Sequence, residues 1–335
     1  MQDSGHILDA SGFTVRRAVL LFVLLLGVGA CAPTLREAGP PAMTPELTAD
    51  KIVVADGAEL PLRRWLPNDE PRAVILALHG FNDYGNFFAV PGEWFAAQGL
   101  AAYTYDQRGF GAAPHPGLWA GTTALDTDLT TVTRLLRARH PGLPVFLLGE
   151  SMGGAVAMTA LTGDDPPPAD GVILASPAVW GRSTMPALQR GLLWLGAHTV
   201  PWLTVSGRGL QRQPSDNIEM LRALGRDPLV IKETRIDALW GLADLMDAAL
   251  GAAPRLPGPA LILHGGNDQI IPEAPVAQML ATLPGGGNGG GNGDGDGPRV
   301  IRYERAYHML LRDLGAEAVW RDILAWIDRP AEPPS

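Results

Sequence analysis

A serine flanked by glycines lies in the segment Gly149-Glu150-Ser151-Met152-Gly153. The apolar run Val145–Leu148 before it has the character of a strand, and the small apolar residues from Met152 to Leu161 favour a helix that packs closely on a sheet. A G-x-S-x-G motif between a strand and a helix holds the serine on a sharp, strained turn with its Oγ exposed. The amino end of the helix also directs positive charge at a developing oxyanion. We therefore predict that Ser151 is a nucleophile rather than part of a chance glycine-serine turn.

A nucleophilic serine needs a base and an acid that orients the base. With this motif, the acid and then the histidine follow the serine along the chain. His308 fits the base because it follows the last apolar run and precedes the last helical pattern. Asp268 fits the acid because it closes the loop after the run Ala260–Leu263. The rivals are His264 for the base and Glu304, which lies close to His308 on the same segment, for the acid.

Two backbone N–H groups must stabilise the oxyanion of an acyl-transfer reaction. The first is expected from Met152, directly after the serine, and the second from the loop that follows an early strand. That loop reads His79-Gly80-Phe81-Asn82, and we predict that Phe81 supplies the donor while His79 and Gly80 shape the turn. This chemistry requires no metal and no organic cofactor.

These residues need a scaffold that brings segments far apart in sequence to one edge. Short, fully apolar runs alternate with helical patterns along the chain, which indicates a mainly parallel sheet with helices on both faces. The fold class is therefore α/β. Asp56-Gly57 separates two further strand-like runs and favours a hairpin. The first six predicted strands are Lys51–Ala55, Leu60–Trp65, Ala73–Leu78, Ala101–Tyr105, Val145–Leu148 and Gly171–Ser176.

Residues 180–237 interrupt this alternation with apolar clusters around a polar middle, and we expect a mostly helical cap inserted after the sixth strand. Trp180, Leu192, Trp194 and Trp202 are candidate substrate-binding residues of this cap. They could line an acyl channel or touch a membrane. The alternative is that they only pack the cap on the core, as apolar clusters do in any domain.

A second interruption, residues 284–298, consists mainly of glycine, asparagine and aspartate between two prolines. Nothing in it can bury apolar surface, so we expect a flexible excursion. Calcium-binding glycine-aspartate repeats have a nine-residue period with apolar positions. This stretch lacks that period, which argues against a calcium site.

The amino terminus resembles a targeting segment. Arg16 and Arg17 precede the uncharged apolar run Ala18–Ala30, which is short for a membrane span and suits a signal peptide. Cys31, the one cysteine of the chain, follows Val28-Gly29-Ala30, as in a bacterial lipobox. We predict lipidation of Cys31 and an anchor in the bacterial cell envelope, on the periplasmic side of the outer membrane. An ordinary signal peptide or an uncleaved anchor is the alternative.

The organisation that follows is a signal peptide over residues 1–30, a Pro- and Ala-rich tether over 31–50 and one hydrolase domain over 51–328. The 335 residues are 46% hydrophobic, which allows a large core. The formal net charge of −9 and the lack of a basic stripe argue against nucleic acid as a partner.

Taken together, the motifs resemble those of the monoacylglycerol lipase and lysophospholipase group of α/β-hydrolases, a serine aminopeptidase-type family. The resemblance runs from about Lys51 to Ile327. It implies the α/β-hydrolase fold, a cap over an acyl pocket, and hydrolysis of single-chain acyl glycerols or related esters. The lipobox, the glycine-rich insertion and the Trp-rich cap depart from the group's pattern. The matching segments are His79–Phe81, Asp106–Gly111, Gly149–Gly154, Asp216–Val230, Asn267-Asp268 and Glu304–His308.

Other functions are compatible with the same three residues, because fold does not determine the reaction. One is an aminopeptidase or haloperoxidase-like activity, although the apolar cap offers no clear acidic group to hold a substrate amine. Another is a lipid-anchored binding protein without activity, although inactive copies usually lose one of the three catalytic residues.

Overall fold

The computed structural model describes residues 32–207, 209, 211–285 and 298–329. The predicted signal peptide, the predicted lipid attachment at Cys31 and most of the glycine-rich insertion lie outside these residues. Within them, no helix is both long and apolar enough to span a bilayer.

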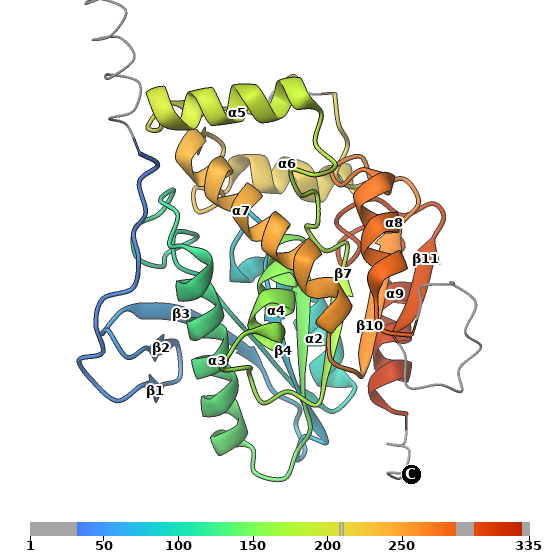
Figure 1. Ribbon diagram of the computed structural model, residues 1–335. Coiled ribbons are helices and arrows are strands. Elements are labelled where there is room, and N and C mark those ends of the chain that lie inside the picture. Colours follow the sequence, from blue (N-terminus) through green and yellow to red (C-terminus); the bar gives the residue numbers. More distant parts are fainter. Residues whose placement is uncertain (1–31, 208, 210, 286–297, 330–335) are drawn as a thin grey trace, which may run out of the picture.

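One nine-stranded sheet organises the described chain, in the order β1-β2-β3-β5-β4-β6-β7-β10-β11 (Figure 1). β1, β2 and β3 run antiparallel to their neighbours, and every pair from β5 to β11 is parallel. The mainly parallel sheet predicted from the apolar runs is therefore confirmed. The strands are β1 (Glu46–Leu47), β2 (Lys51–Val53), β3 (Glu59–Trp65), β4 (Ala73–Leu78), β5 (Leu100–Tyr105), β6 (Val145–Glu150), β7 (Gly171–Ala175), β10 (Ala260–Gly265) and β11 (Arg299–Tyr303).

Helices cover both faces of the sheet. Alternate residues of β4 enter different clusters: Val74, Leu76 and Leu78 face α3, α4 and α7, whereas Ala73, Ile75 and Ala77 face α2 and α9. Both faces of the central strands are thus buried, which is why these strands read as continuous apolar runs. The elements outside the cap are η1 (Gly85–Phe88), α2 (Ala89–Ala97), α3 (Thr122–Arg139), α4 (Met152–Thr162), α7 (Ile236–Ala252), η2 (Ala253–Arg255), α8 (Glu273–Thr282) and α9 (Ala316–Ile327).

The described part of the predicted tether, residues 32–50, lies along the domain. The Arg36 N–H donates to the Trp119 carbonyl at 2.8 Å, the Ala42 N–H donates to the Ala55 carbonyl at 2.7 Å, and Leu47 pairs with Ile52. The edge of the β2–β3 hairpin offers unpaired backbone groups, and this segment pairs with them. These residues of the predicted tether therefore pair with the domain, and the strand before the cap becomes the seventh because β1 adds one.

The same hairpin is fixed to the domain by Arg108. Its guanidinium bonds to Asp56 in the β2–β3 turn at 2.7 Å and to Asp128 on α3 at 2.6 Å. Burial of an arginine usually requires such paired carboxylates.

The predicted cap segment, 180–237, contains the helices α5 (Ala187–Thr199) and α6 (Ile218–Arg226) and the short strand pair β8 (Thr204–Val205) and β9 (Thr234–Arg235). Figure 1 shows α5 and α6 above the sheet, with the first half of α7 beneath α5. At the start of the cap, the Arg182 guanidinium pairs with Asp244 and Asp247 at 2.8 and 2.5 Å. It also lies 4.1 Å from the centre of the Trp240 ring, so α7 anchors the cap.

Candidate active site

The turn between β6 and α4 holds Ser151 in a strained conformation, with φ 54° and ψ −114°. A Cβ on Gly149 would lie 2.4 Å from the Gly153 carbonyl oxygen, and one on Gly153 would lie 2.3 Å from the Leu78 carbonyl oxygen. Both positions therefore require glycine. Left-handed backbone at a residue other than glycine persists only where the surrounding structure enforces it, and here tight packing between β4, β6 and α4 does so.

Three predicted residues from distant segments meet at this turn. His308 Nε2 lies 2.9 Å from Ser151 Oγ, and His308 Nδ1 lies 2.7 Å from Asp268 Oδ2. The side chains of His308 and Asp268 are only 6% and 9% exposed. A carboxylate can only accept, so Nδ1–H donates to Asp268 and Nε2 accepts the serine proton. This is the arrangement that activates a serine.

The environment of Asp268 favours its ionised form. Burial by itself raises the pKa of this carboxyl, but the hydrogen bond and charge of His308 and two backbone donors outweigh it and lower the pKa below its usual value. The N–H groups of Ile270 and Ile271 donate to Oδ1 at 2.8 and 3.0 Å. These backbone bonds fix the carboxylate, so its other oxygen can orient the imidazole.

The rival acid and base are not part of this arrangement. Glu304 pairs with Arg302 at 3.1 Å and is 74% exposed. His264 lies in β10 opposite Arg302, and burial lowers the pKa of its ring. No hydrogen bond joins either residue to Ser151, Asp268 or His308 within the described chain.

The loop after β4 lies directly against the nucleophile, since a Cβ on Gly80 would be 3.4 Å from the Ser151 Cβ. Buried His79 holds this loop: its Nδ1–H donates to the Gly80 carbonyl at 2.8 Å, and its Nε2 accepts the Gln107 N–H at 3.0 Å. Burial lowers the pKa of His79, so the neutral ring that these bonds need is favoured. The loop of the predicted donor Phe81 therefore lies beside Ser151, and the other predicted donor, Met152, is the first residue of α4, where helical N–H groups lack internal partners.

Residues 227–234, which follow α6 and return from the cap to the core, contact the loop after β4. This loop is called the oxyanion loop below because it contains the predicted donor Phe81. Asn82, at φ 65°, donates from Nδ2 to Thr234 Oγ1 at 2.6 Å, and its carbonyl accepts the Ile231 N–H at 2.9 Å. The Tyr84 hydroxyl donates to Asp227 Oδ2 at 2.7 Å. The peptide of the predicted Phe81 donor is thus fixed from the cap side.

A second cap segment, residues 213–215 before α6, contacts the loops of the predicted acid and base. Ser215 donates to Asp313 Oδ1 at 2.6 Å, and the Met309 N–H donates to the Pro214 carbonyl at 2.9 Å. Close to Asp268, the Gln213 N–H donates to the Gln269 side chain at 2.9 Å. Cap residues on both sides of α6 therefore contact the loop of the predicted Phe81 donor and the loops of Asp268 and His308.

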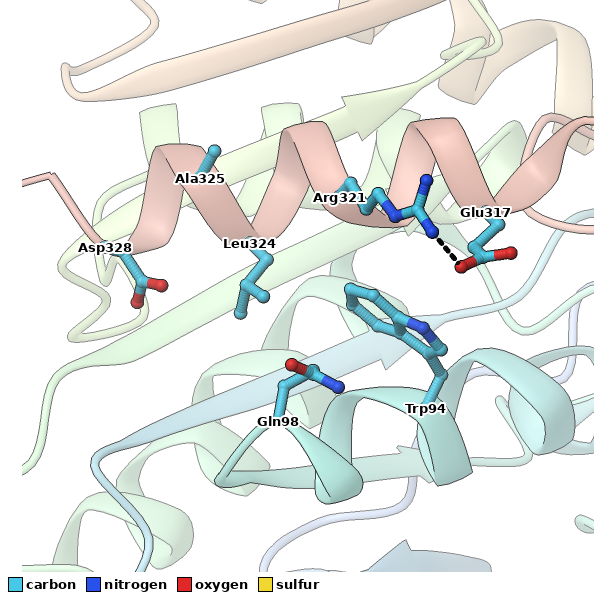
Figure 2. Close-up of a pocket in the computed structure, with 7 residues that line it drawn as sticks. All are labelled: Trp94, Gln98, Glu317, Arg321, Leu324, Ala325 and Asp328. Carbon is cyan, nitrogen blue, oxygen red and sulfur yellow. Dashed lines mark hydrogen bonds and ion pairs between the residues drawn. The ribbon is translucent and has the colours of Figure 1, made fainter.

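Two hollows bear on where a ligand could bind. A small cavity of about 10 Å³ lies beside the oxyanion loop, between Phe81, Phe110, Trp119 and Ile231. A larger groove of about 420 Å³ lies between α2 and α9 (Figure 2) and is lined by Trp94, Gln98, Glu317, Arg321, Leu324, Ala325 and Asp328.

The larger groove is remote from the serine. Asp328 pairs with Arg72, which directly precedes β4, so the groove reaches the edge of the sheet where the parallel strands begin. Ser151 follows the end of β6, at the opposite edge.

The predicted cap residues occupy different environments. Trp180 is half-buried and packs against the core. Leu192, Trp194 and Trp202 are 60%, 49% and 57% exposed, so they lie largely on the surface. Trp194 also stacks on His198, with ring centres 4.7 Å apart.

One group of buried charges near the nucleophile was not predicted. Arg312 pairs with Asp83 at 2.7 Å and with Glu150 at 3.0 Å. A signal was present in the sequence, since Glu150 follows an apolar strand and Arg312 follows the apolar run Met309–Leu311. Charges in such surroundings are almost never buried unless they are paired. Within the described residues, no group of three or more His, Cys, Asp or Glu side chains could hold a metal ion.

Comparison with known proteins places this geometry in a family. The model of the serine aminopeptidase S33 family matches residues 69–315. The chain belongs to the serine aminopeptidase S33 family. This match spans the nucleophile turn, the acid loop and the histidine.

Curated relatives are similar over most of the chain. The monoglyceride lipase of Rattus norvegicus is 25% identical over 304 residues, which cover 87% of this chain and 95% of the relative. The monoacylglycerol lipase of Mycolicibacterium smegmatis is 28% identical over 218 residues, covering 63% of this chain and 75% of the relative.

Solved structures share the fold. A soluble variant of monoglyceride lipase from Saccharomyces cerevisiae, in complex with a substrate analog, superposes with a TM-score of 0.67 at 21% identity and covers 89% of this chain and 98% of that one. The predicted α/β-hydrolase fold is confirmed, and the family and relatives identify the chain as a carboxylic ester hydrolase.

Proposed function

We propose that this enzyme hydrolyses single-chain acyl esters of the monoacylglycerol or lysophospholipid type, with Ser151 as nucleophile, His308 as base and Asp268 as the orienting acid. The contact between His308 Nε2 and Ser151 Oγ at 2.9 Å carries the proposal, because it links a serine on a strained turn to a base that is itself oriented. The curated relatives named above support the substrate class.

The reaction proceeds in two acyl-transfer steps. His308 takes the Ser151 proton as Oγ attacks the ester carbonyl, and the N–H groups of Phe81 and Met152 stabilise the oxyanion. His308 then protonates the leaving alcohol, which leaves an acyl ester on Ser151. Water, deprotonated by the same imidazole, releases the fatty acid, while Asp268 stabilises the imidazolium throughout.

The surface of the cap supports a lipid-like substrate. Leu188, Leu192 and Leu195 project from one face of α5, since their spacing is four and three residues, and all three are exposed. Exposed apolar patches of this kind mark sites that contact membranes or other partners. We propose that this face of α5 rests on the lipid surface from which the substrate is drawn.

The decisive experiment labels wild type and Ser151→Ala with a fluorophosphonate probe and then assays monoacylglycerols, lysophospholipids and amino-acid amides. We expect labelling and monoacylglycerol turnover by wild type, and neither by the alanine variant. Labelling that survives the substitution would exclude Ser151 as the nucleophile. Labelling together with amide cleavage but no ester turnover would favour the aminopeptidase function that the family description names.

We further propose that Cys31 carries a lipid anchor. The proposal rests on the sequence around the cysteine, and a lipid-like substrate agrees with it. Expression of the full chain in a bacterial host with labelled palmitate tests it. Wild type should incorporate the label and sediment with membranes, and Cys31→Ala should do neither. Equal incorporation by both variants would exclude lipidation at this cysteine.

A further inference from the structure

Arg312 places a buried positive charge close to the nucleophile. It lies four residues after His308 in the loop between β11 and α9, and its side chain is only 9% exposed. One guanidinium nitrogen lies 2.7 Å from Asp83 Oδ2 and 3.0 Å from Glu150 Oε1. The guanidinium carbon also lies 5.7 Å from the centre of the Phe87 ring.

The two carboxylates belong to the two other loops that form the site. Glu150 is the residue directly before Ser151, and Asp83 follows Phe81 by two residues in the oxyanion loop. A single side chain on the base loop therefore contacts the loop of the nucleophile and the loop of the oxyanion donor.

We propose that Arg312 is a positioning residue. Through Glu150 and Asp83 it keeps the nucleophile, the oxyanion donor and the base at fixed positions relative to one another. This inference rests on the proposed function of Ser151 and His308. It extends that function to a residue that touches neither the substrate nor the reacting atoms.

The charges require this arginine. Burial raises the pKa of Glu150, and the charge of Arg312 is the main influence that opposes the rise. Glu150 Oε2 has no hydrogen-bond partner among the described side chains and backbone, so Arg312 supplies the pairing for this carboxylate. Without Arg312, two carboxylates would remain in a buried space without a counter-ion, and repulsion would separate the loops that carry them.

A lysine at position 312 would keep the charge and lose the geometry. In wild type one nitrogen of a planar guanidinium contacts both carboxylates while the group lies near the Phe87 ring, whereas an ammonium is a compact point charge on a flexible stem and does not reproduce this planar placement. We expect Arg312→Lys to lower kcat for a soluble short-chain ester, and the rate of fluorophosphonate labelling, by about 10- to 100-fold with little change in KM, since small misplacements of catalytic groups cost this much.

Arg108→Lys is a matched control. Arg108 is also 9% exposed and also pairs with two buried carboxylates, Asp56 and Asp128, but these lie on the hairpin turn and on α3. Both lysine variants should lower the Tm by similar amounts, and only Arg312→Lys should lower kcat and the labelling rate. An equal loss of activity in both variants at an equal loss of Tm would show that Arg312 acts only on stability and would overturn the proposal.

Glu150→Gln and Asp83→Asn test the two contacts of Arg312 while the arginine itself stays in place. These variants also test the proposal if Arg312→Lys does not fold. Each should slow labelling less than Arg312→Lys does, and the effect of Glu150→Gln should shrink in the Arg312→Lys background because the pair is already broken. Labelling at the wild-type rate in both carboxamide variants would contradict the proposal. Because labelling requires the activated nucleophile and the oxyanion hole but no ester substrate, it still tests Arg312 if no ester proves to be a substrate.

Discussion

At the residue scale, the site depends on one serine held in a conformation that its neighbours enforce and one imidazole held in a single orientation. Ser151 is strained because glycine on either side allows strand and helix to approach more closely than any side chain would permit. His308 is oriented by Asp268, whose second oxygen is fixed by two backbone donors. We therefore expect the reactivity of Ser151 to depend on groups that do not touch the substrate.

Asp268→Asn tests this dependence. The amide can present its NH₂ group to His308, which favours the tautomer with the proton on Nε2, and that nitrogen then cannot accept from Ser151. We expect kcat to fall by about 10⁴-fold at neutral pH, the loss typical of this substitution in a Ser-His-Asp site. Steady-state kinetics on a soluble ester, with KM measured separately, would show it.

The matched control is Glu304→Gln, at the rival acid. Glu304 is exposed and pairs with Arg302. Its substitution should change kcat less than about twofold, because surface pairs contribute little. A large loss at Glu304 and none at Asp268 would reverse the assignment of the acid.

At the scale of elements, helices α3 and α4 pack side by side over the sheet and share a carboxyl group that burial perturbs. Thr159 on α4 donates to Asp126 Oδ1 on α3 at 2.7 Å. Burial raises the pKa of Asp126 to about 7, and the hydrogen bond from Thr159 only partly opposes this rise. The pairing of the two helices should therefore respond to pH.

The direction of this response follows from proton linkage. With its pKa raised in the folded state, Asp126 contributes stability that is fully present below its unfolded pKa, near 4, and that is lost as the pH rises through 7. Asp126→Asn keeps an acceptor for Thr159 and removes the titration. We expect the variant to be more stable than wild type at pH 8 by about 1–2 kcal/mol, less than the full shift implies because the side chain is partly exposed.

Urea unfolding at several pH values measures this difference. At pH 4 the two proteins should have similar free energies of unfolding, and their curves should separate between pH 5 and 8. Asp164→Asn, at an exposed carboxyl group soon after α4, should give a curve parallel to that of wild type. Parallel curves for Asp126→Asn and wild type would contradict the expected pKa of Asp126.

At the scale of the whole molecule, the cap presents apolar surface outward and a polar return segment inward. Residues 227–234 contact the oxyanion loop and residues 213–215 contact the loops of Asp268 and His308, so the cap and the site are linked by hydrogen bonds. The leucines on the outer face of α5 are exposed. A lipid aggregate on this face would be next to the element that organises the site.

A variant with serine at Leu188, Leu192 and Leu195 should separate surface binding from chemistry. Each buried leucine contributes about 1.5–3 kcal/mol in an apolar environment, so partitioning onto phospholipid vesicles should weaken at least about 10-fold. Turnover of a soluble short-chain ester should stay near the wild-type value. Vesicle sedimentation and two substrate assays, one soluble and one dispersed in vesicles, give these readouts.

Val90→Ser is the control for loss of exposed apolar surface, since Val90 is exposed on α2, far along the chain from the cap. It should leave vesicle binding unchanged. If the triple serine variant binds vesicles as wild type does, α5 does not contact the lipid surface.

Residue types and chain order were enough to predict the nucleophile turn, the alternation of strands and helices, and the choice of His308 and Asp268. These features are local, or follow from chain order, because parallel strands deliver the loops at their carboxyl ends to one edge. The structure confirmed the fold and brought the three residues within hydrogen-bonding distance of one another. The pairing of residues 46–47 with β2 was not predicted. Such pairing at the edge of a sheet depends on which segment lies beside the edge strand, and the sequence pattern does not show this.

Which charged side chains are buried together became visible only in three dimensions. Nothing in the sequence relates Asp83, Glu150 and Arg312, which are separated by 67 and 162 residues along the chain. Their pairing exists because β4, β6 and β11 end at the same edge of the sheet, so the loops that follow them converge on the nucleophile. Burial then makes the pairing obligatory, since an unpaired charge in that space would cost more than the fold can supply. The spacing of motifs in the sequence predicted the reacting side chains. The convergence of the strands placed the buried charges beside them.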